Sequence, residues 1–175
     1  MQYKIFNLPE FIAFIRENPS LARQLFENMN EYYKQFYPRI RFSFDIFAKE
    51  ARKYWDKMLF VFALDSENAH TFAGFLTANA FSKEESGIVY LAHVIVEKSQ
   101  RQRGIGAELV RAFAQWVAEN RFFDESISRF IVDINTANHA SLAAFKKIGF
   151  VEDAETQARR QAEGKLNYIR LQLTI

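Results

Sequence analysis

The segment IVYLAHVIVEKSQRQRGIG, residues 88–106, changes from apolar to charged to glycine-rich within a few positions. Its first part, Ile88 to Val96, is almost continuously apolar, which predicts a strand buried on both faces. Beyond the glycines, apolar residues recur every fourth position from Ile105 to Val117, which predicts an amphipathic helix with a polar outer side. The segment therefore predicts a strand, a charged loop and a helix in direct succession.

The loop between that strand and that helix has the features of an anion-binding site. Gly104 and Gly106 permit unusual backbone dihedrals and leave no side chain to block a ligand. The free N–H groups of the first helical turn point into the gap, and the helix dipole adds partial positive charge. Arg101 and Arg103 supply full charges, so the loop suits a diphosphate. The alternative is a simple strand-to-helix turn with solvated arginines, because the spacing matches neither the dinucleotide fingerprint nor a P-loop.

The rest of the chain predicts one α/β (α+β) domain with a mixed sheet. Residues 1–58 are predicted to be helical: Pro9 marks a helix start, and Ser20 is a candidate cap for a second helix over about 21–36. Arg159, Arg160 and Lys165 are predicted to lie in a loop between the last strands. The remaining predicted elements are strands over 59–64, 72–81, 129–134 and 169–175, and a helix over 141–148 that ends at Gly149.

Composition narrows the functional classes. The chain has 175 residues, which fits one domain, and no cysteine, which excludes disulfides, thiolate metal sites and a cysteine nucleophile. A formal net charge of +2 argues against a nucleic-acid binder or a membrane-surface protein. Because no secretory leader or membrane-length apolar segment is evident, we expect a cytoplasmic protein. We also expect that the protein needs no metal.

Two motifs together carry a family resemblance. Arg101-x-x-Gly104-x-Gly106, after an apolar strand, resembles the acetyl-CoA signature of the GNAT superfamily of N-acetyltransferases. Residues 138–150, NHASLAAFKKIGF, resemble that family's Asn-x-x-Ala-x-x-x-Tyr-x-Lys-x-Gly-Phe helix. The second motif has Ser141 as a small-residue replacement and departs at Phe145, where many members have tyrosine. The resemblance covers roughly residues 59–175.

The resemblance implies the GNAT fold: a mixed central sheet of about six to seven strands with helices on both faces. It also implies a V-shaped splay between two parallel strands, here the strands over 88–96 and 129–134. We expect residues 1–175 to form a single GNAT domain. Its acceptor side would be the helical region 1–58, and its acetyl-CoA-binding core would be residues 59–175.

The same resemblance implies where acetyl-CoA binds. Its pantetheine arm would pair with the main chain of Val94, Ile95 and Val96, and one of these N–H groups would stabilise the oxyanion. Asn138 would contact the cofactor from the other side, although an asparagine before a helix also serves as a cap. The loop residues implied in binding the pyrophosphate are Arg101, Gln102, Arg103, Gly104, Ile105, Gly106 and Ala107.

The implied reaction is direct attack by a primary amine, of a small molecule or a peptide, on acetyl-CoA in a ternary complex. A lysine-like amine must first lose its proton, which costs roughly 4.6 kcal/mol at pH 7. His93 is the leading candidate base, and its alternative is a hydrogen-bonded core histidine. Because Phe145 cannot donate a proton, we expect the thiolate to leave unassisted or with Tyr90 or Tyr168 as the acid.

The sequence is also compatible with functions besides acetyl transfer. The domain could bind acyl-CoA as a catalytically silent sensor or partner module, and a nucleotide-binding oxidoreductase is a more distant possibility. The acceptor amine is unidentified, and a homodimer is one option for the oligomeric state. Aromatic residues near the N-terminus either line a hydrophobic acceptor pocket or belong to the core; they are Tyr32, Tyr33, Phe36, Tyr37, Phe42, Phe44 and Phe47.

Overall fold

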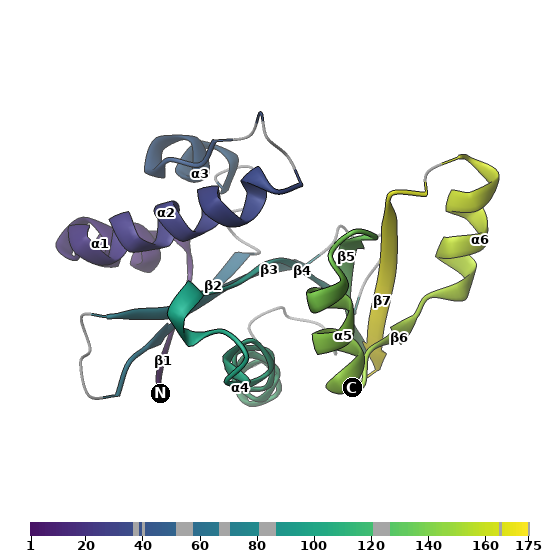
Figure 1. Cartoon of the computed structure of the whole chain (residues 1–175). Helices are drawn as coiled ribbons and strands as arrows, with labels where there is room; N and C mark the ends of the chain where they lie inside the picture. Colours follow the sequence, from purple (N-terminus) through teal and green to yellow (C-terminus); the bar gives the residue numbers. More distant parts are fainter. Residues whose placement is uncertain are drawn as a thin grey trace.

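A mixed seven-stranded sheet, in the order β1-β2-β3-β4-β5-β7-β6, forms the centre of the molecule (Figure 1). The structure is a computed structural model that describes residues 1–36, 39, 41–51, 58–66, 71–80, 87–120, 127–164 and 166–174. The strands are β1 (Gln2–Phe6), β2 (Met58–Leu64), β3 (Phe72–Ala80), β4 (Ile88–Val96), β5 (Arg129–Asn135), β6 (Val151–Glu152) and β7 (Tyr168–Thr174). All neighbouring strands are antiparallel except β4 and β5, which are parallel.

Helices cover both faces of this sheet, as the sequence predicts (Figure 1). One face carries α1 (Leu8–Glu17), α2 (Pro19–Lys34) and α3 (Phe44–Ala51), and the other carries α4 (Ile105–Asn120) and α5 (His139–Lys147). A short 3-10 turn, η3 (Lys98–Gln100), precedes α4, and α6 (Ala154–Ala162) lies beside β7. The fold class predicted from the sequence is therefore confirmed.

Each face of the sheet has its own hydrophobic core. On the α1–α3 face, Phe11 stacks on Phe60 with ring centroids 4.3 Å apart and is fully buried. On the α4–α5 face, Phe113 of α4 packs on Phe130 of β5, with centroids 5.5 Å apart. The many phenylalanines therefore fill two layers, and of the seven N-terminal aromatic residues, Phe47 belongs to the first core.

The N-terminal region is not purely helical, which corrects one prediction. Gln2–Phe6 forms β1 and pairs with β2 from Gln2↔Leu64 to Phe6↔Phe60. A run of five residues has too little periodicity to indicate a strand by itself, and only the edge of β2 makes it one. Ser20 is also not a cap, because α2 begins at Pro19 with Asn18 as its N-cap residue.

The region between the last two strands is the second correction. Arg159 and Arg160 lie in helix α6 rather than in a loop, and Asp153 caps that helix by accepting from the Thr156 N–H at 3.0 Å. Thr156 is the only residue of α6 that is buried, so the helix lacks the apolar stripe by which helices are recognised in a sequence. Lys165, Tyr37 and residues 67–70 and 81–86 lie outside the described residues.

β4 is less buried than its apolar sequence predicts. Val89 and Leu91 are buried, but Tyr90, Ala92, His93, Val94 and Val96 are half-buried. Apart from Tyr90, these half-buried residues lie where β4 no longer pairs with β5. None of the helices in the described ranges is long and apolar enough to cross a membrane.

Candidate active site

The parallel strands β4 and β5 separate along their length. They pair from Ile88↔Arg129 to Tyr90↔Ile131, yet β4 continues to Val96 and β5 to Asn135. Beyond Tyr90 the backbone of β4 therefore lacks its partner on this side. This geometry confirms the V-shaped splay that the family resemblance implies.

A β-bulge in β4 lies at the start of the splay. Ala78 of β3 pairs with Leu91, and the next residue, Thr77, pairs with His93, so Ala92 has no partner in the ladder. A bulge of this kind bends the strand and increases its local twist. It therefore helps to turn the second half of β4 away from β5.

The loop after β4 presents unpaired main-chain N–H groups. Its turn uses two positive φ angles, 65° at Gln102 and 85° at Gly104. The first hydrogen bond of α4 runs from the Glu108 N–H to the Gly104 carbonyl at 3.0 Å, so the N–H groups of residues 105–107 have no partner within the helix. This arrangement fits the phosphate-binding role that the sequence implies for the loop, because such N–H groups favour an anion.

A hydrogen bond from the Arg101 side chain joins this loop to the end of β4. Its Nε donates to the Val96 carbonyl at 3.1 Å, and its buried Nη2 has no hydrogen-bond partner among the described residues. Arg103, in contrast, is exposed and donates to the side chain of Gln100. A Cβ at Gly106 would lie 3.5 Å from Val96, so the start of α4 packs closely against the end of β4.

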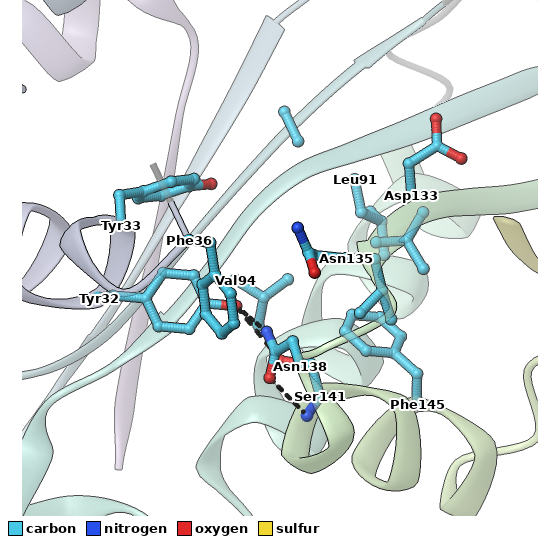
Figure 2. A pocket seen from close by; sticks show the side chains of 13 residues that line it. Tyr32, Tyr33, Phe36, Leu91, Val94, Asp133, Asn135, Asn138, Ser141 and Phe145 are labelled. Carbon is cyan, nitrogen blue, oxygen red and sulfur yellow. Dashed lines mark hydrogen bonds between the residues drawn. The ribbon is translucent and has the colours of Figure 1, made fainter. Parts of the chain in front are cut away.

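A pocket occupies the open end of the splay (Figure 2). Its floor comes from both strands, one wall from α5, and the opposite wall from the end of α2. The lining residues are Leu91, Ala92 and Val94 of β4, Val132, Asp133, Ile134 and Asn135 of β5, Asn138, Ser141 and Phe145 of α5 and its cap, and Tyr32 and Tyr33 at the end of α2 with Phe36 just after it. The N-terminal aromatic residues are thus divided, with these three at the pocket and Phe47 in the core.

Asn138 links α5 to α2 across this pocket. Its Oδ1 accepts from the Ser141 N–H at 3.1 Å, which caps α5, and its Nδ2 donates to the Tyr32 hydroxyl (Figure 2). The capping role left open by the sequence is therefore confirmed. Its role in cofactor binding stays a prediction.

The end of α2 is also tied to the β4 side. Glu31, next to Tyr32, accepts from Lys98 of η3 at 2.8 Å, and this hydrogen bond and charge lower the pKa of Glu31. Both groups are well exposed, so the ion pair contributes little to stability. Neighbouring residues of α2 thus contact the segments that follow β4 and β5.

His93 faces away from the pocket. It is half-buried, its Nδ1 lies 2.8 Å from the Thr77 hydroxyl, and its ring lies among those of Tyr33, Phe42 and Phe47. Burial lowers the pKa of His93 to about 4, so the imidazole is neutral at pH 7 and a weak base. The geometry favours the core-histidine alternative, and a catalytic role for His93 stays an untested prediction.

The candidate acids do not line the pocket. Tyr90 lies at the closed end of the splay, where it pairs with Ile131, and Tyr168 pairs with Asn135 in the ladder between β5 and β7. Phe145 does line the pocket and is buried, with its ring edge-on to Phe150 at 5.0 Å. The structure therefore places a side chain without a proton to donate at the pocket.

Asp133 and Asn135 are pocket residues that neither sequence motif includes. Asp133 forms ion pairs with Arg170 of β7 and Arg160 of α6, both at 2.9 Å. Burial acts to raise the pKa of Asp133, but hydrogen bonds from both arginines hold it below its usual value. The signal in the sequence is the alternation of Asp133 and Asn135 with the buried Val132 and Ile134, which gives β5 one polar face.

The family to which this chain, with its splay, bulge and glycine loop, belongs is shown by its sequence. A sequence profile of the acetyltransferase (GNAT) family matches residues 22–150. The chain belongs to the GNAT family of acetyltransferases. It is therefore an acyltransferase by family, and a search of curated proteins found no match.

Solved structures of GNAT proteins share the fold at low sequence identity. The acetyltransferase of the GNAT family from Staphylococcus aureus is 14% identical, with 99% of each chain covered and a TM-score of 0.67. The PaiA N-acetyltransferase of Thermoplasma acidophilum, solved in complex with coenzyme A, is 13% identical, with 100% of each chain covered and a TM-score of 0.61. An aminoglycoside 6'-acetyltransferase type Ii is 18% identical, with 99% of this chain and 97% of that chain covered and a TM-score of 0.64.

Proposed function

We propose that this GNAT protein transfers the acetyl group of acetyl-CoA to a primary amine by direct attack in a ternary complex. The observation that carries the proposal is the splay, because β4 and β5 stop pairing at Tyr90↔Ile131 and leave a pocket between them. The unpaired edge of β4 from Val94 to Val96 can pair with the amides of pantetheine as an added strand would. A relative of the same fold was solved with coenzyme A, which agrees with this use of the fold.

The loop 101–107 is the proposed pyrophosphate site. Its residues fit a diphosphate, because residues 105–107 offer N–H groups without helical partners and Gly104 has the positive φ that the turn needs. The buried, unpartnered Nη2 of Arg101 adds a charged donor beside the end of β4. Acetyl-CoA would supply the activated acetyl thioester, and these residues would hold its phosphates at one end of the splay.

The end of α2 is the proposed acceptor wall, which places the acceptor side in residues 1–58. Tyr33 and Phe36 give this wall an apolar surface. An apolar surface favours the neutral form of an amine, because burial penalises the charged form. This desolvation offsets part of the roughly 4.6 kcal/mol that a lysine-like amine needs to lose its proton at pH 7. The cytoplasmic location and the homodimer stay predictions.

Binding and turnover of acetyl-CoA by the purified protein test the proposal. We expect calorimetric binding of acetyl-CoA and release of free CoA thiol when a panel of primary amines is added. Since the chain contains no cysteine, a thiol reagent will report only the CoA product. If acetyl-CoA binds but no free CoA thiol is released, either when amines are added or by slow hydrolysis, the result would support the catalytically silent module instead. Absence of binding would overturn both functions.

A further inference from the structure

Resting on the proposed function, we infer that the Tyr32 hydroxyl protonates the departing CoA thiolate. Tyr32 is half-buried near the end of α2, and its side chain points across the pocket toward Asn138 (Figure 2). It lies on an element that neither sequence motif includes. The inference therefore adds a catalytic residue from the N-terminal region to a pocket otherwise built by β4, β5 and α5.

The hydrogen bonds of Asn138 fix the direction of the Tyr32 proton. Because Asn138 Oδ1 accepts from the Ser141 N–H at 3.1 Å, the Nδ2 group faces Tyr32 and must donate to its oxygen. The hydroxyl oxygen is thus an acceptor in this contact, and its own proton is left to point elsewhere. The Tyr32 oxygen also lies 3.4 Å from Ser141 Oγ, which is long for a hydroxyl pair. The Tyr32 proton is therefore available to a group in the pocket.

The other polar side chains at the pocket are poorer proton donors. Asp133 is held as a carboxylate by Arg160 and Arg170, so it carries no proton at neutral pH. Asn135 and Asn138 have amide groups, which donate hydrogen bonds but do not act as acids. Phe145, on the α5 side of the pocket, has no proton to donate.

The remaining hydroxyls at the pocket are Tyr33 and Ser141. Ser141 has an aliphatic hydroxyl, a weaker acid than a phenol. The Tyr33 ring packs edge-on against Tyr32 and against His93. Tyr32 is thus the phenol whose oxygen contacts the α5 wall, and Asn138 also stabilises the negative charge that grows on this oxygen as the proton leaves.

The proposed step balances in atoms and electrons. The amine nitrogen forms a bond to the acetyl carbon, the carbon–sulfur bond breaks, and the sulfur takes the electron pair of that bond. The sulfur receives the proton of the Tyr32 hydroxyl, and the nitrogen loses one proton to solvent. Water then returns a proton to the tyrosinate, so the net products are the acetylated amine and free CoA thiol.

The test compares Tyr32→Phe with wild type at saturating acetyl-CoA and with an amine that the wild type acetylates. General acids contribute typically ~10²–10⁴-fold, so we expect kcat to fall on the order of 100-fold, with the Kd for CoA unchanged. Adding Phe145→Tyr to Tyr32→Phe should recover at least about ten-fold of the lost kcat, because the new hydroxyl enters the same pocket. Tyr3→Phe is the matched control. The Tyr3 hydroxyl donates to Glu108 at 2.6 Å, and neither residue lines the pocket, so loss of this hydroxyl should leave kcat unchanged.

Each outcome decides the inference separately from the proposed function. A kcat of Tyr32→Phe within about three-fold of wild type would overturn the proton-donor role while the proposed function stands. A fall in activity explained by weaker CoA binding, or one that Phe145→Tyr does not recover, would assign Tyr32 a positioning role and equally overturn the inference. If the wild type itself binds no CoA, the proposed function fails before Tyr32 is tested.

Discussion

The loop after β4 and the end of α2, which the ion pair between Lys98 and Glu31 joins, are built on different principles. The loop offers main-chain N–H groups of residues 105–107, shaped by the positive φ of Gly104. The end of α2 offers the side chains of Tyr32, Tyr33 and Phe36. A main-chain site is set by local conformation, whereas a side-chain site is set by tertiary packing. The first therefore leaves a motif in the sequence, and the second does not.

Gly104→Val should break the main-chain site and give the largest effect. Valine at a φ of 85° is strained, so the turn must rearrange, and the N–H groups will no longer converge on the phosphates. Losing about two charge-assisted hydrogen bonds, roughly 3 kcal/mol, should raise the Kd for acetyl-CoA on the order of 100-fold. Isothermal calorimetry measures the change.

Gly164→Val is the matched control for that experiment. Gly164 also has a positive φ, of 69°, with open space at its Cβ, but it follows α6 far along the chain from the loop. We expect a comparable loss of stability in urea with an unchanged Kd for acetyl-CoA. Equal affinities of both variants and wild type would show that the loop does not bind the phosphates.

The variant His93→Gln tests whether the aromatic side of the site includes a catalytic base. Because burial holds the folded pKa at about 4, below the ordinary 6.5, the folded state favours the neutral ring. The wild type should therefore lose stability relative to His93→Gln as the pH falls from 6.5 toward 4, by up to about 1.4 kcal/mol per pH unit. Urea unfolding at pH 7 and pH 5 measures this difference.

The same variant settles the catalytic question. We expect kcat of His93→Gln within about three-fold of wild type and an unchanged pH profile, since a general base typically contributes ~10²–10⁴-fold. A hundred-fold fall together with a lost inflection in the pH profile would restore His93 as the base.

Phe145→Tyr in the otherwise native protein should give the smallest effect. If Tyr32 already donates the proton, a second hydroxyl at the pocket adds little, and kcat should rise less than about three-fold. Steady-state rates at saturating acetyl-CoA check this, with CoA affinity as the control. A large rise would mean that the native pocket lacks an acid, so that Tyr32 of α2 does not supply the proton and only the new hydroxyl on α5 does.

The same contrast explains how much the sequence could predict. The splayed strands, the loop and α4 follow from apolar runs, glycines and a clear helical period, and all are local patterns. β1 depends on the edge of β2, α6 has no apolar stripe, and neither is visible locally. Tyr32 meets Asn138 across 106 positions of the chain, so its place at the pocket emerges only from the fold.

The unpaired Ala92 has a consequence for the whole second half of β4. If Ala92 took a regular place in the ladder, strict alternation would turn His93 to the same side of the sheet as Leu91, toward α4, and Val94 to the α2 side. Because Ala92 is instead an extra residue, Leu91 and Val94 share a face and Ile95 points into the opposite layer. Deleting Ala92 would therefore leave every later side chain on its present side of the sheet and remove only the bend that the bulge gives β4. Here one extra residue sets the direction of a strand, so its presence matters more than its identity.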